Sequence, residues 1–446
     1  MANASTYLHR TFTAGNQRKF TGSVWFKRAR LTSGYEKIMQ GRDGSDSYDT
    51  SISFDPTDHI RFESWHNGAY TGGRRHTTRV FRDIAAWTHL VFVVDSENAT
   101  AEDRMQIWIN GVRETSFSTN VACTQDTDFY INKAGATNYI GSHSGSTDAN
   151  CFTGQFAHYH FCDGQAYSAS DFGEFDSTSG IWVAKTSPSV TYGENGFFLK
   201  FASGASGTDS SGEGNNMTVV GTLTNNKDNP DNNFATWNVL AQPNGTLSNG
   251  NTSNSGCEDI GATLGAIKGK WYWEYKRTNT TNSLHYGICS TKGGFNCAPQ
   301  QMLNTGTNAV GSCIYISEGG TGNTTYGSAG GGFSSPSYSV PAFSIANGDV
   351  VGCALDISTS SGTVEWFKNG TSLGTASFTY DQVTEVYPFI RMNSGATTDT
   401  NFGNGYFGTT AISSAGTSSS GDDSVWEYNC PADHYGFNTK NIATYG

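Results

Sequence analysis

The fold class is decided by the stretch Met105-Gln106-Ile107-Trp108-Ile109-Asn110-Gly111. Apolar and polar residues alternate over its first five positions, which places every second side chain on one face of a β-strand. The Asn-Gly pair that follows is the strongest short-range signal for a two-residue hairpin. The second half of the chain repeats the arrangement in Thr363-Val364-Glu365-Trp366-Phe367-Lys368-Asn369-Gly370. Both halves are therefore predicted to contain antiparallel sheet.

Short strands are predicted along the rest of the chain as well, at 22–27, 89–95, 156–161, 196–201, 269–275, 284–290 and 349–357. The 446 residues include 54 Gly and only 15 % charged residues, which is typical of a turn-rich protein. Aromatic residues, at 13 %, argue against disorder. A single short helical turn is expected, at 168–175. We predict an all-β protein of two tandem antiparallel β-sandwich (jelly-roll-like) domains.

The domain boundary is predicted in a polar, proline-containing stretch without apolar periodicity, residues 223–233. This linker separates a first domain at 1–222 from a second at 234–446. The shared pattern of the two halves is too sparse to distinguish duplication from similar topology reached separately.

Composition and charge exclude several classes of function. The net charge is −12, and the one basic cluster (Arg74, Arg75, Arg79 and Arg82) is short and interrupted, so no nucleic-acid partner is expected. No apolar run approaches the roughly 20 residues that span a bilayer, so no membrane association is expected. The first residues lack the pattern of a signal peptide, which predicts synthesis in a cytoplasm without secretory export.

Nine cysteines are present, and none forms a C-x-x-C pair. Several lie within strand patterns, as Cys289 and Cys353 do, where a small buried apolar side chain is the expected role. Zinc is not expected without closely spaced ligand pairs.

Four segments of the first half carry a family resemblance: 7–12, 86–92, 104–111 and 161–166. They resemble the laminin-G/concanavalin-A-like lectin fold, in the form common in bacteriophage tail and virion proteins.

Segments of the second half resemble a SPRY (B30.2-like) domain: 269–274, 286–288, 348–356, 364–370 and 387–389. The closing 436–441 looks like a family terminus. The two resemblances in this order imply a virion component of a phage, a tail fibre or capsid appendage, made in the host cytoplasm. They imply host cell-surface carbohydrate and other virion structural proteins as partners, and a homo-oligomer. No coiled-coil heptad is present, so assembly would use sandwich faces or edge strands.

Concanavalin-A-like folds also host retaining glycosidases, which need two carboxyl groups about 5–5.5 Å apart. On a strand this requires an E-x-D-x-E run, and no strand pattern here contains one. Glu274 and Glu365 stand alone, while Asp171, Glu174 and Asp176 have the spacing of a loop or helical turn. We therefore expect no enzymatic activity.

A loop at 41–49 concentrates Asp43, Asp46 and Asp49. Calcium accepts oxygens from such loops, which makes these residues a candidate Ca²⁺ site. Asp, Gly and Ser are also ordinary hairpin-turn residues, and we favour the turn interpretation without a cofactor.

Sugar binding combines an aromatic face with planar polar side chains, so the search is for aromatic residues in loops. Trp65, His66, Asn67 and Tyr70 gather beside a glycine-containing turn and are the candidates in the first domain. In the second domain, the glycine-rich loops at 295–301 and 319–333 present Tyr326 and Phe333. Tryptophans within strands are instead expected in the core: Trp25, Trp87, Trp108, Trp271, Trp273 and Trp366.

Three hypotheses follow for the function. The first is a virion adhesin that recognises a host surface glycan. The second is a structural or adaptor protein of the virion whose sandwiches contact neighbouring subunits. The third and weakest is a depolymerase that cleaves glycans.

Overall fold

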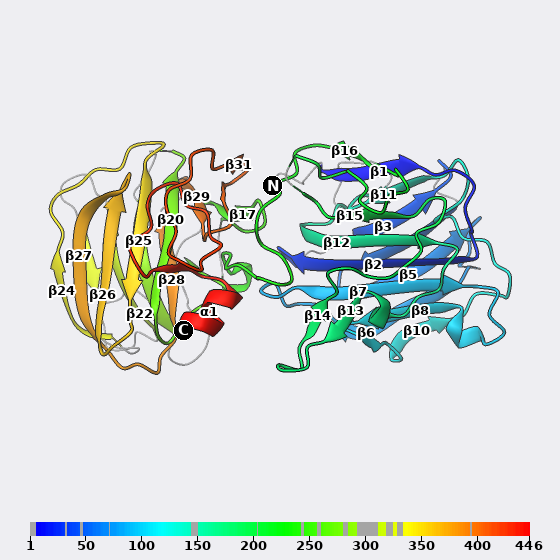
Figure 1. Cartoon of the computed structure of the whole chain (residues 1–446), viewed down its shortest axis with the longest axis horizontal. Coiled ribbons are helices and arrows are strands. Elements are labelled where there is room, and N and C mark those ends of the chain that lie inside the picture. The colour runs from blue at the N-terminus through cyan, green and yellow to red at the C-terminus, as the bar shows by residue number, and fades with distance from the viewer. Residues whose placement is uncertain are drawn as a thin grey trace. The chain divides into compact units, whose positions relative to one another are not determined.

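The structure is a computed structural model that describes residues 6–446 except 32–33, 45–47, 71, 144–149, 203, 242–244, 257–259, 280–283, 292–310, 318–323, 328–332 and 393–394. The chain divides into two compact units, residues 1–225 and 226–446. We call them domain 1 and domain 2 (Figure 1). Each is a β-sandwich, so the all-β prediction is confirmed.

Domain 1 contains a large sheet and a small sheet in its described part, both antiparallel (Figure 1). The eight-stranded sheet has the order β10 (Phe117–Val121), β6 (Arg74–Val80), β5 (His59–His66), β4 (Tyr48–Phe54), β3 (Glu36–Arg42), β11 (Thr137–Ile140), β1 (Tyr7–Thr11), β16 (Thr218–Val220). The six-stranded sheet has the order β15 (Phe197–Leu199), β12 (Gly154–Asp163), β2 (Lys19–Arg28), β7 (Thr88–Asp95), β8 (Met105–Ile109), β9 (Val112–Arg113). A hairpin of β13 (Gly173–Phe175) and β14 (Trp182–Ala184) and two short 3₁₀ turns, η1 (Ala101–Asp103) and η2 (Ala169–Asp171), complete the domain.

The core of domain 1 lies between its two sheets. Alternate residues of each strand point into it, as Ile60 and Phe62 of β5 and Phe92 of β7 do. The outer face of the six-stranded sheet is covered as well, because Trp25, Trp87 and Trp182 pack there with the β13–β14 hairpin. The outer face of the eight-stranded sheet carries charged and aromatic side chains instead, among them Arg61, Glu63 and Trp65 of β5.

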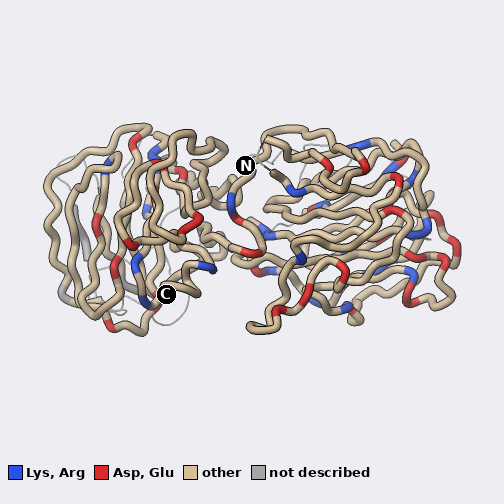
Figure 2. Tube along the Cα trace, in the orientation of Figure 1, with Lys and Arg blue, Asp and Glu red and all other residues tan. Residues whose placement is uncertain are grey.

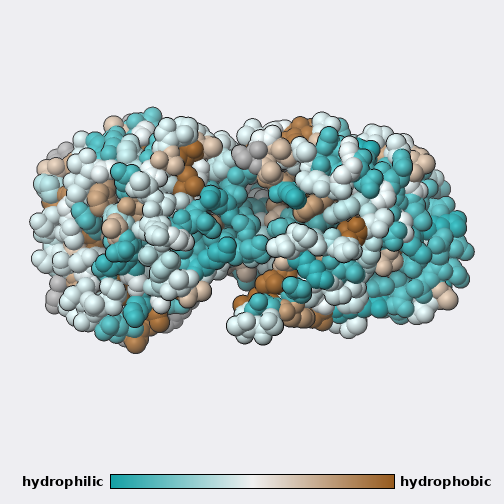
Figure 3. Space-filling model, viewed as in Figure 1, coloured by the Kyte–Doolittle hydropathy of each residue, from teal (hydrophilic) through white to brown (hydrophobic). Residues whose placement is uncertain are grey.

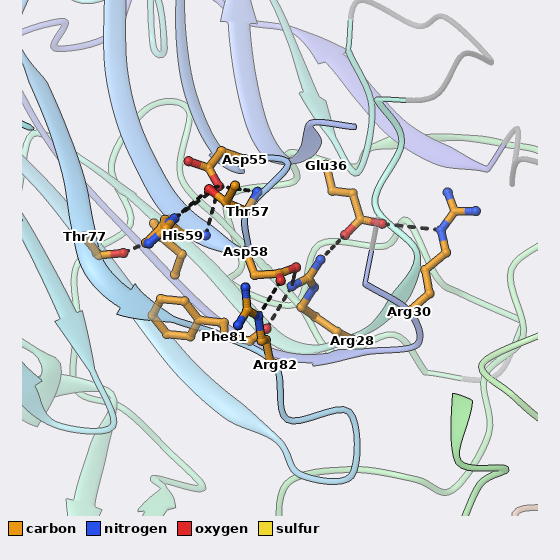
Figure 4. Close-up of polar contacts among 11 residues, drawn as sticks. Arg28, Arg30, Glu36, Asp55, Thr57, Asp58, His59, Thr77, Phe81 and Arg82 are labelled. Atoms are coloured by element: carbon orange, nitrogen blue, oxygen red, sulfur yellow. Dashed lines mark hydrogen bonds and ion pairs between the residues drawn. The ribbon is translucent and has the colours of Figure 1, made fainter. Parts of the chain in front are cut away.

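A cluster of buried charges joins the two sheets of domain 1 (Figure 4). Arg28, the last residue of β2, extends its guanidinium between Glu36, the first residue of β3, and Asp58 in the β4–β5 turn. Its Nη2 lies 3.0 Å from Glu36 Oε2, and its Nη1 lies 2.9 Å from Asp58 Oδ1. Both the Arg28 and Glu36 side chains are fully buried. Arg82 approaches the other Asp58 oxygen at 2.8 Å from a largely exposed position.

Domain 2 is a second sandwich. Its larger sheet has the order β17 (Thr246–Ser248), β18 (Ser253–Ser255), β29 (Thr397–Asn401), β20 (Lys270–Arg277), β25 (Val350–Asp356), β26 (Ser361–Lys368), β27 (Thr371–Tyr380), β24 (Phe333–Ser339), with β32 (Tyr435–Gly436) parallel to β20. Its five-stranded sheet has the order β19 (Ile260–Gly261), β28 (Val386–Met392), β21 (Leu284–Thr291), β22 (Gly311–Ser317), β23 (Thr324–Gly327). The remaining elements are η3 (Val239–Ala241), the pair β30 (Tyr406–Phe407) and β31 (Thr410–Ala411), and a helix α1 (Thr439–Tyr445).

The core of domain 2 contains the tryptophans predicted for it. Trp271, Trp273 and Trp366 are fully buried, together with Trp237. The prediction of core tryptophans is confirmed for the predicted residues of domain 2, whereas in domain 1 Trp25 and Trp87 are buried on the outer face of the six-stranded sheet and Trp108 is half-buried beside them. The seven cysteines in the described part of the chain are also buried.

Both domains build the same local meander. Lys19 and Asp95 are register partners at the ends of β2 and β7, with an ion pair of 3.4 Å; Lys270 and Asp356 repeat this on β20 and β25, also at 3.4 Å. The next hairpin turns on Asn110 in domain 1 and Asn369 in domain 2, with φ of 46° and 48°. Each asparagine side chain accepts a hydrogen bond of 2.8 Å from a backbone N–H near the start of the preceding long strand, that of His89 in β7 or Val350 in β25. The similarity noticed in the sequence therefore reflects one shared hydrogen-bonding arrangement.

The stretch predicted as a linker, 223–233, is not a free connector. Its first residues belong to domain 1, where Asn225 Nδ2 donates to the Phe201 carbonyl at 2.7 Å. Its last residues belong to domain 2, where Asp228 accepts from the backbone of Phe234 and is almost fully buried. The polar residues that suggested a linker satisfy backbone groups instead.

Two helical features differ from the sequence expectation. The expected helical turn at 168–175 is the 3₁₀ turn η2, closed by a capping box of Ser168 and Asp171, and it gives way to strand β13. The helix α1 was not predicted. Asn438 caps it by accepting from the backbone of Asn441, and it has seven residues. Within the described ranges, no helix has the length and apolar character needed to cross a bilayer.

Candidate functional site

The predicted residues of domain 1 surround the hairpin between β5 and β6. His66 and Ala69 exchange backbone hydrogen bonds of 2.8 and 3.1 Å, which closes a two-residue turn over Asn67 and Gly68. Both turn residues have positive φ, 45° and 89°, as this turn type requires. Asn67 is exposed. Asparagine tolerates a positive φ better than most residues do, which accounts for its presence in this turn.

Trp65 and Tyr70 come together on the outer face of the eight-stranded sheet. Their rings meet edge to face with centroids 4.5 Å apart, and both are half-buried. The Arg74 guanidinium lies over the Tyr70 ring at 4.2 Å. Arg74 also contacts Glu63 at 3.3 Å, and Glu63 pairs with Arg61 at 2.8 Å. Arg61 and Arg74 thus share one glutamate, and this face presents aromatic rings beside a network of ion pairs.

His66 turns to the opposite side of the strand from Trp65, because successive side chains alternate. Its ring meets that of Tyr130 edge to face at 5.0 Å, and its Nε2 lies 2.9 Å from Ser64 Oγ. Ser64 contacts Thr50 at 2.7 Å, and Thr50 in turn accepts from the backbone N–H of Tyr130 at 2.9 Å. This chain of hydrogen bonds fixes Tyr130 beside His66. The predicted residues therefore do not form one site: Trp65 and Tyr70 lie on the outer face of the sheet, whereas His66 lies on the opposite side, beside Tyr130.

A surface hollow of about 530 Å³ opens beside His66 and Tyr130. We call it the Tyr130 hollow. It is lined by Gln17, His66, Thr124, Thr127, Asp128, Tyr130 and Lys133. These side chains offer two hydroxyls, an amide, an imidazole, a carboxylate, an ammonium and a phenol, so hydrogen-bond donors and acceptors converge around an aromatic ring.

The charges of the Tyr130 hollow are largely balanced. Lys133 Nζ lies over the Tyr130 ring at 4.4 Å and 3.8 Å from Asp43, while Asp128 pairs with Arg18 at 2.6 Å. Burial lowers the pKa of His66, so its imidazole is neutral at physiological pH and can both donate and accept. Burial raises the pKa of Tyr130, so its phenol keeps its proton. The hollow therefore suits a ligand that is polar and uncharged.

Most residues of the Tyr130 hollow were missed by sequence analysis. Tyr130 and Lys133 follow β10, and Gln17 precedes β2, so the hollow is assembled from segments far apart in the chain. The stretch 124–130 is a polar loop ending in an aromatic pair, Phe129 and Tyr130, of which Phe129 is buried in the core. That pattern was the signal in the sequence that could have pointed to Tyr130 as an accessible aromatic residue.

The described members of the predicted calcium site have other partners. Asp49 accepts a hydrogen bond from Gln40 at 2.7 Å, and Asp43 approaches Lys133. Asp46 lies outside the described residues. In the described part of the chain, no group of three or more acidic, histidine or cysteine side chains has a metal-binding arrangement. The calcium site therefore stays a prediction.

The predicted site in domain 2 requires one correction. Phe333 is not at an exposed loop tip but is 2 % exposed in the core, 5.0 Å from the ring of Phe378. It begins strand β24, whose pairing with β27 turns it inward. Tyr326 is in strand β23, and its side chain lies outside the described part of the structure, as do residues 295–301.

Of the carboxylates considered for catalysis, Asp171, Asp176 and Glu274 have structural contacts. Asp171 caps η2, and Asp176 accepts bonds from the backbone of Thr178 and Ser179 in a turn. Glu274 is fully buried and accepts from the backbone N–H groups of Glu427 and Tyr428, each at 2.9 Å. A carboxyl group buried in this way is beyond the reach of a substrate.

Each arginine of the predicted basic cluster contacts a carboxylate, although Glu63 is shared with Arg61 and Asp58 with Arg28. Arg74 pairs with Glu63 at 3.3 Å, Arg75 with Glu102 at 3.1 Å, Arg79 with Glu114 at 3.3 Å and Arg82 with Asp58 at 2.8 Å. Figure 2 shows the basic residues of both domains interspersed with acidic ones. Arginines already paired in this way leave little charge for a phosphate backbone.

Comparison with known proteins agrees with this architecture. Residues 3–171 match the Laminin_G_3 family, described as the concanavalin A-like lectin/glucanases superfamily, and residues 270–405 match the SPRY domain family. No curated protein matches the chain.

Two solved structures are similar at low identity. The native heptameric SAP-like pentraxin from Limulus polyphemus is 15 % identical over 41 % of this chain and 87 % of its own, with a TM-score of 0.26. The TRIM65 PSpry domain is 12 % identical over 37 % of this chain and 91 % of its own, with a TM-score of 0.27. The family matches confirm both resemblances expected from the sequence: the chain carries a concanavalin A-like domain of the Laminin_G_3 family followed by a SPRY domain.

Proposed function

We propose that this chain is a non-enzymatic binding protein whose first domain recognises a carbohydrate in the Tyr130 hollow. The observation that carries the proposal is the convergence of seven polar and aromatic side chains on one concave surface of a lectin-like sandwich. A pyranose ring presents hydroxyls around its rim and C–H groups on its faces. The hydroxyls of Thr124 and Thr127 and the amide of Gln17 suit the rim, and the ring of Tyr130 suits a face.

The biological setting we propose is a phage particle. The order of the two domains is the one expected of a virion protein, which supports a tail-fibre or capsid-appendage protein made in the host cytoplasm. Its ligand would be a host cell-surface glycan, and it would act as a homo-oligomer beside other virion proteins. No cofactor is part of the proposal. A calcium requirement would appear as binding that is lost in chelator and recovered when the metal is restored.

Tyr130→Ala is expected to weaken glycan binding about tenfold or more, because it removes the aromatic wall of the hollow and the partner of His66. The measurement is saturable binding of fluorescently labelled full chain to bacterial cells of candidate hosts, with and without periodate oxidation of the surface glycans. Binding by the unmodified chain should be abolished by periodate.

Two matched variants accompany this experiment. Trp65→Ala alters the aromatic pair on the opposite side of the same strand, so it tests whether the outer face binds instead. Phe175→Ala removes an exposed aromatic ring from the β13–β14 hairpin and should leave binding unchanged. Equal affinity of Tyr130→Ala and the unmodified chain would contradict the site, and periodate-resistant binding would contradict the ligand class.

A second candidate function, contact with another protein, is favoured by an exposed apolar surface on domain 1. Phe175 and Ile181 on the β13–β14 hairpin are 56 % and 64 % exposed. Val112 is 57 % exposed in the β8–β9 hairpin, whose Gly111 abuts the Trp182 ring. Apolar side chains gather over this hairpin in Figure 3. Such a patch is typical of a subunit contact, as in a structural or adaptor role in a virion. Loss of self-association or of virion incorporation in Phe175→Ala, with glycan binding intact, would separate the two functions.

A further inference from the structure

Two cysteines of domain 2 lie directly opposite each other on neighbouring strands. Cys289 of β21 and Cys313 of β22 are register partners in the antiparallel ladder. Their strand neighbours Ile288 and Ile314 point into the core, so both cysteines point to the other face of the five-stranded sheet. There they form an apolar cluster with Tyr315, Tyr387 and Phe389, and their exposed fractions are 2 % and 0 %.

The pairing of Cys289 with Cys313 in the ladder brings the two residues close to the spacing that a disulfide requires. Directly opposite residues of an antiparallel pair have Cα atoms about 4.5–5.5 Å apart, and a disulfide needs about 4.4–6.8 Å. Their Cβ atoms lie about 4.5–5.5 Å apart, slightly beyond the roughly 3.5–4.5 Å of a disulfide. A small closing movement of the two strands therefore suffices.

A second observation shows that the two strands already approach closely here. A Cβ placed on Gly287, two residues before Cys289 on the same face, would lie 2.0 Å from the Ile314 carbonyl oxygen and 2.7 Å from Tyr315 Cα. Only glycine permits this approach of β21 to β22.

We propose that Cys289 and Cys313 are a cross-strand redox pair, carried as thiols in this structure and joined as a disulfide by a low-molecular-weight disulfide such as oxidised glutathione. While domain 2 folds, before the aromatic cluster encloses the pair, one cysteine thiolate attacks the glutathione disulfide, which releases one glutathione and leaves a mixed disulfide. The other cysteine then displaces the second glutathione. The protein loses two electrons and two protons, and one oxidised glutathione becomes two reduced molecules.

The surroundings of the two cysteines favour the uncharged thiols and the uncharged disulfide over a charged thiolate. The aromatic cluster excludes water, and a disulfide, like two thiols, is uncharged and fits among apolar side chains. The disulfide would join β21 to β22 covalently. It would also reduce the conformational entropy of the unfolded chain. Domain 2 would thus become more resistant to unfolding after leaving a reducing cytoplasm. This inference does not depend on glycan binding.

The test is to refold the full chain from urea in oxidised glutathione and, in parallel, in reduced glutathione. Non-reducing digestion with trypsin and chymotrypsin, followed by mass spectrometry, should find the Cys289 peptide joined to the Cys313 peptide only in the oxidised sample. That sample should have two fewer thiols that react with iodoacetamide in denaturant. Its urea midpoint should shift upward and return after reduction.

Matched variants make the outcome specific. Cys313→Ala should lose both the link and the shift. Cys353→Ala should keep both, because Cys353 is equally buried but its register partners are Trp273 and Trp366. Cys297→Ala should also keep both. Refolding in oxidised glutathione without the Cys289–Cys313 link, or with either cysteine joined to a different one, would overturn the proposal.

Discussion

Arg28→Met is expected to lower the free energy of unfolding of domain 1 by about 3–5 kcal/mol, because it removes the buried counterion that Glu36 and Asp58 share. Glu36 is fully buried, and burial raises its pKa in opposition to the effect of Arg28. Without Arg28, Asp58 keeps its contact with the exposed Arg82, and Glu36 keeps a longer contact of 3.7 Å with Arg30. Methionine keeps much of the packing against Phe54, over which the guanidinium lies at 4.4 Å. Native-state hydrogen exchange of peptides from β7 measures the change, with peptides from β25 as an internal reference.

A control variant removes the solvent-exposed arginine that contacts Asp58. Arg82→Met removes a 2.8 Å contact with Asp58, but the Arg82 side chain is 57 % exposed. Its loss should therefore cost no more than about 1 kcal/mol. Adding Glu36→Gln and Asp58→Asn to Arg28→Met should recover much of the lost stability, since no buried charge then remains. Equal effects of Arg28→Met and Arg82→Met would show that the cluster does not stabilise the fold through burial.

The strands of both domains could be predicted because their signal is local. Alternation in 105–109 and 363–367, each followed by Asn-Gly, specifies strand and turn without reference to the rest of the chain. Strand β24 lacks that signal. Its sequence, Phe333-Ser334-Ser335-Pro336-Ser337-Tyr338-Ser339, is polar, contains proline and follows a glycine run. Only pairing with β27 makes it a strand, and for that reason Phe333 was mistaken for an exposed residue.

The candidate site was only partly accessible to sequence analysis for a related reason. Trp65 and His66 are adjacent in the chain, but the alternation of a strand sends them to opposite faces, and the hairpin's own pattern contained that information. The contact between His66 and Tyr130 spans a long stretch of chain and depends on the loop after β10. No periodicity in the sequence encodes such a contact. The Tyr130 hollow could therefore be identified only from the folded structure.

The same limit applies to Glu274, which sequence analysis considered only as an isolated acid. Its carboxylate accepts hydrogen bonds from the backbones of Glu427 and Tyr428, from Asn401 at 3.2 Å and from the hydroxyl of Tyr272 at 3.3 Å. Glu274 thereby attaches the segment after β31 to β20. Burial raises its pKa from an ordinary 4.5 to about 7, although these hydrogen bonds oppose the rise.

Glu274→Gln is expected to remove a pH dependence from the stability of domain 2. Between pH 4.5 and 7 the folded chain holds a proton on Glu274 that the unfolded chain has released, so the free energy of unfolding falls as pH rises through this range. The shift corresponds to about 3 kcal/mol, fully lost above pH 7. Glutamine does not titrate, so the stability of the variant relative to the unmodified chain should rise by about 2–3 kcal/mol from pH 5 to pH 8. Urea titrations across this range, followed by hydrogen exchange of β25 peptides, measure the difference. Placing a glutamine amide among four hydrogen-bond donors costs the same stability at every pH, so this cost does not affect the pH dependence of the difference. A difference that stays level with pH would mean that the four hydrogen bonds keep Glu274 ionised despite its burial.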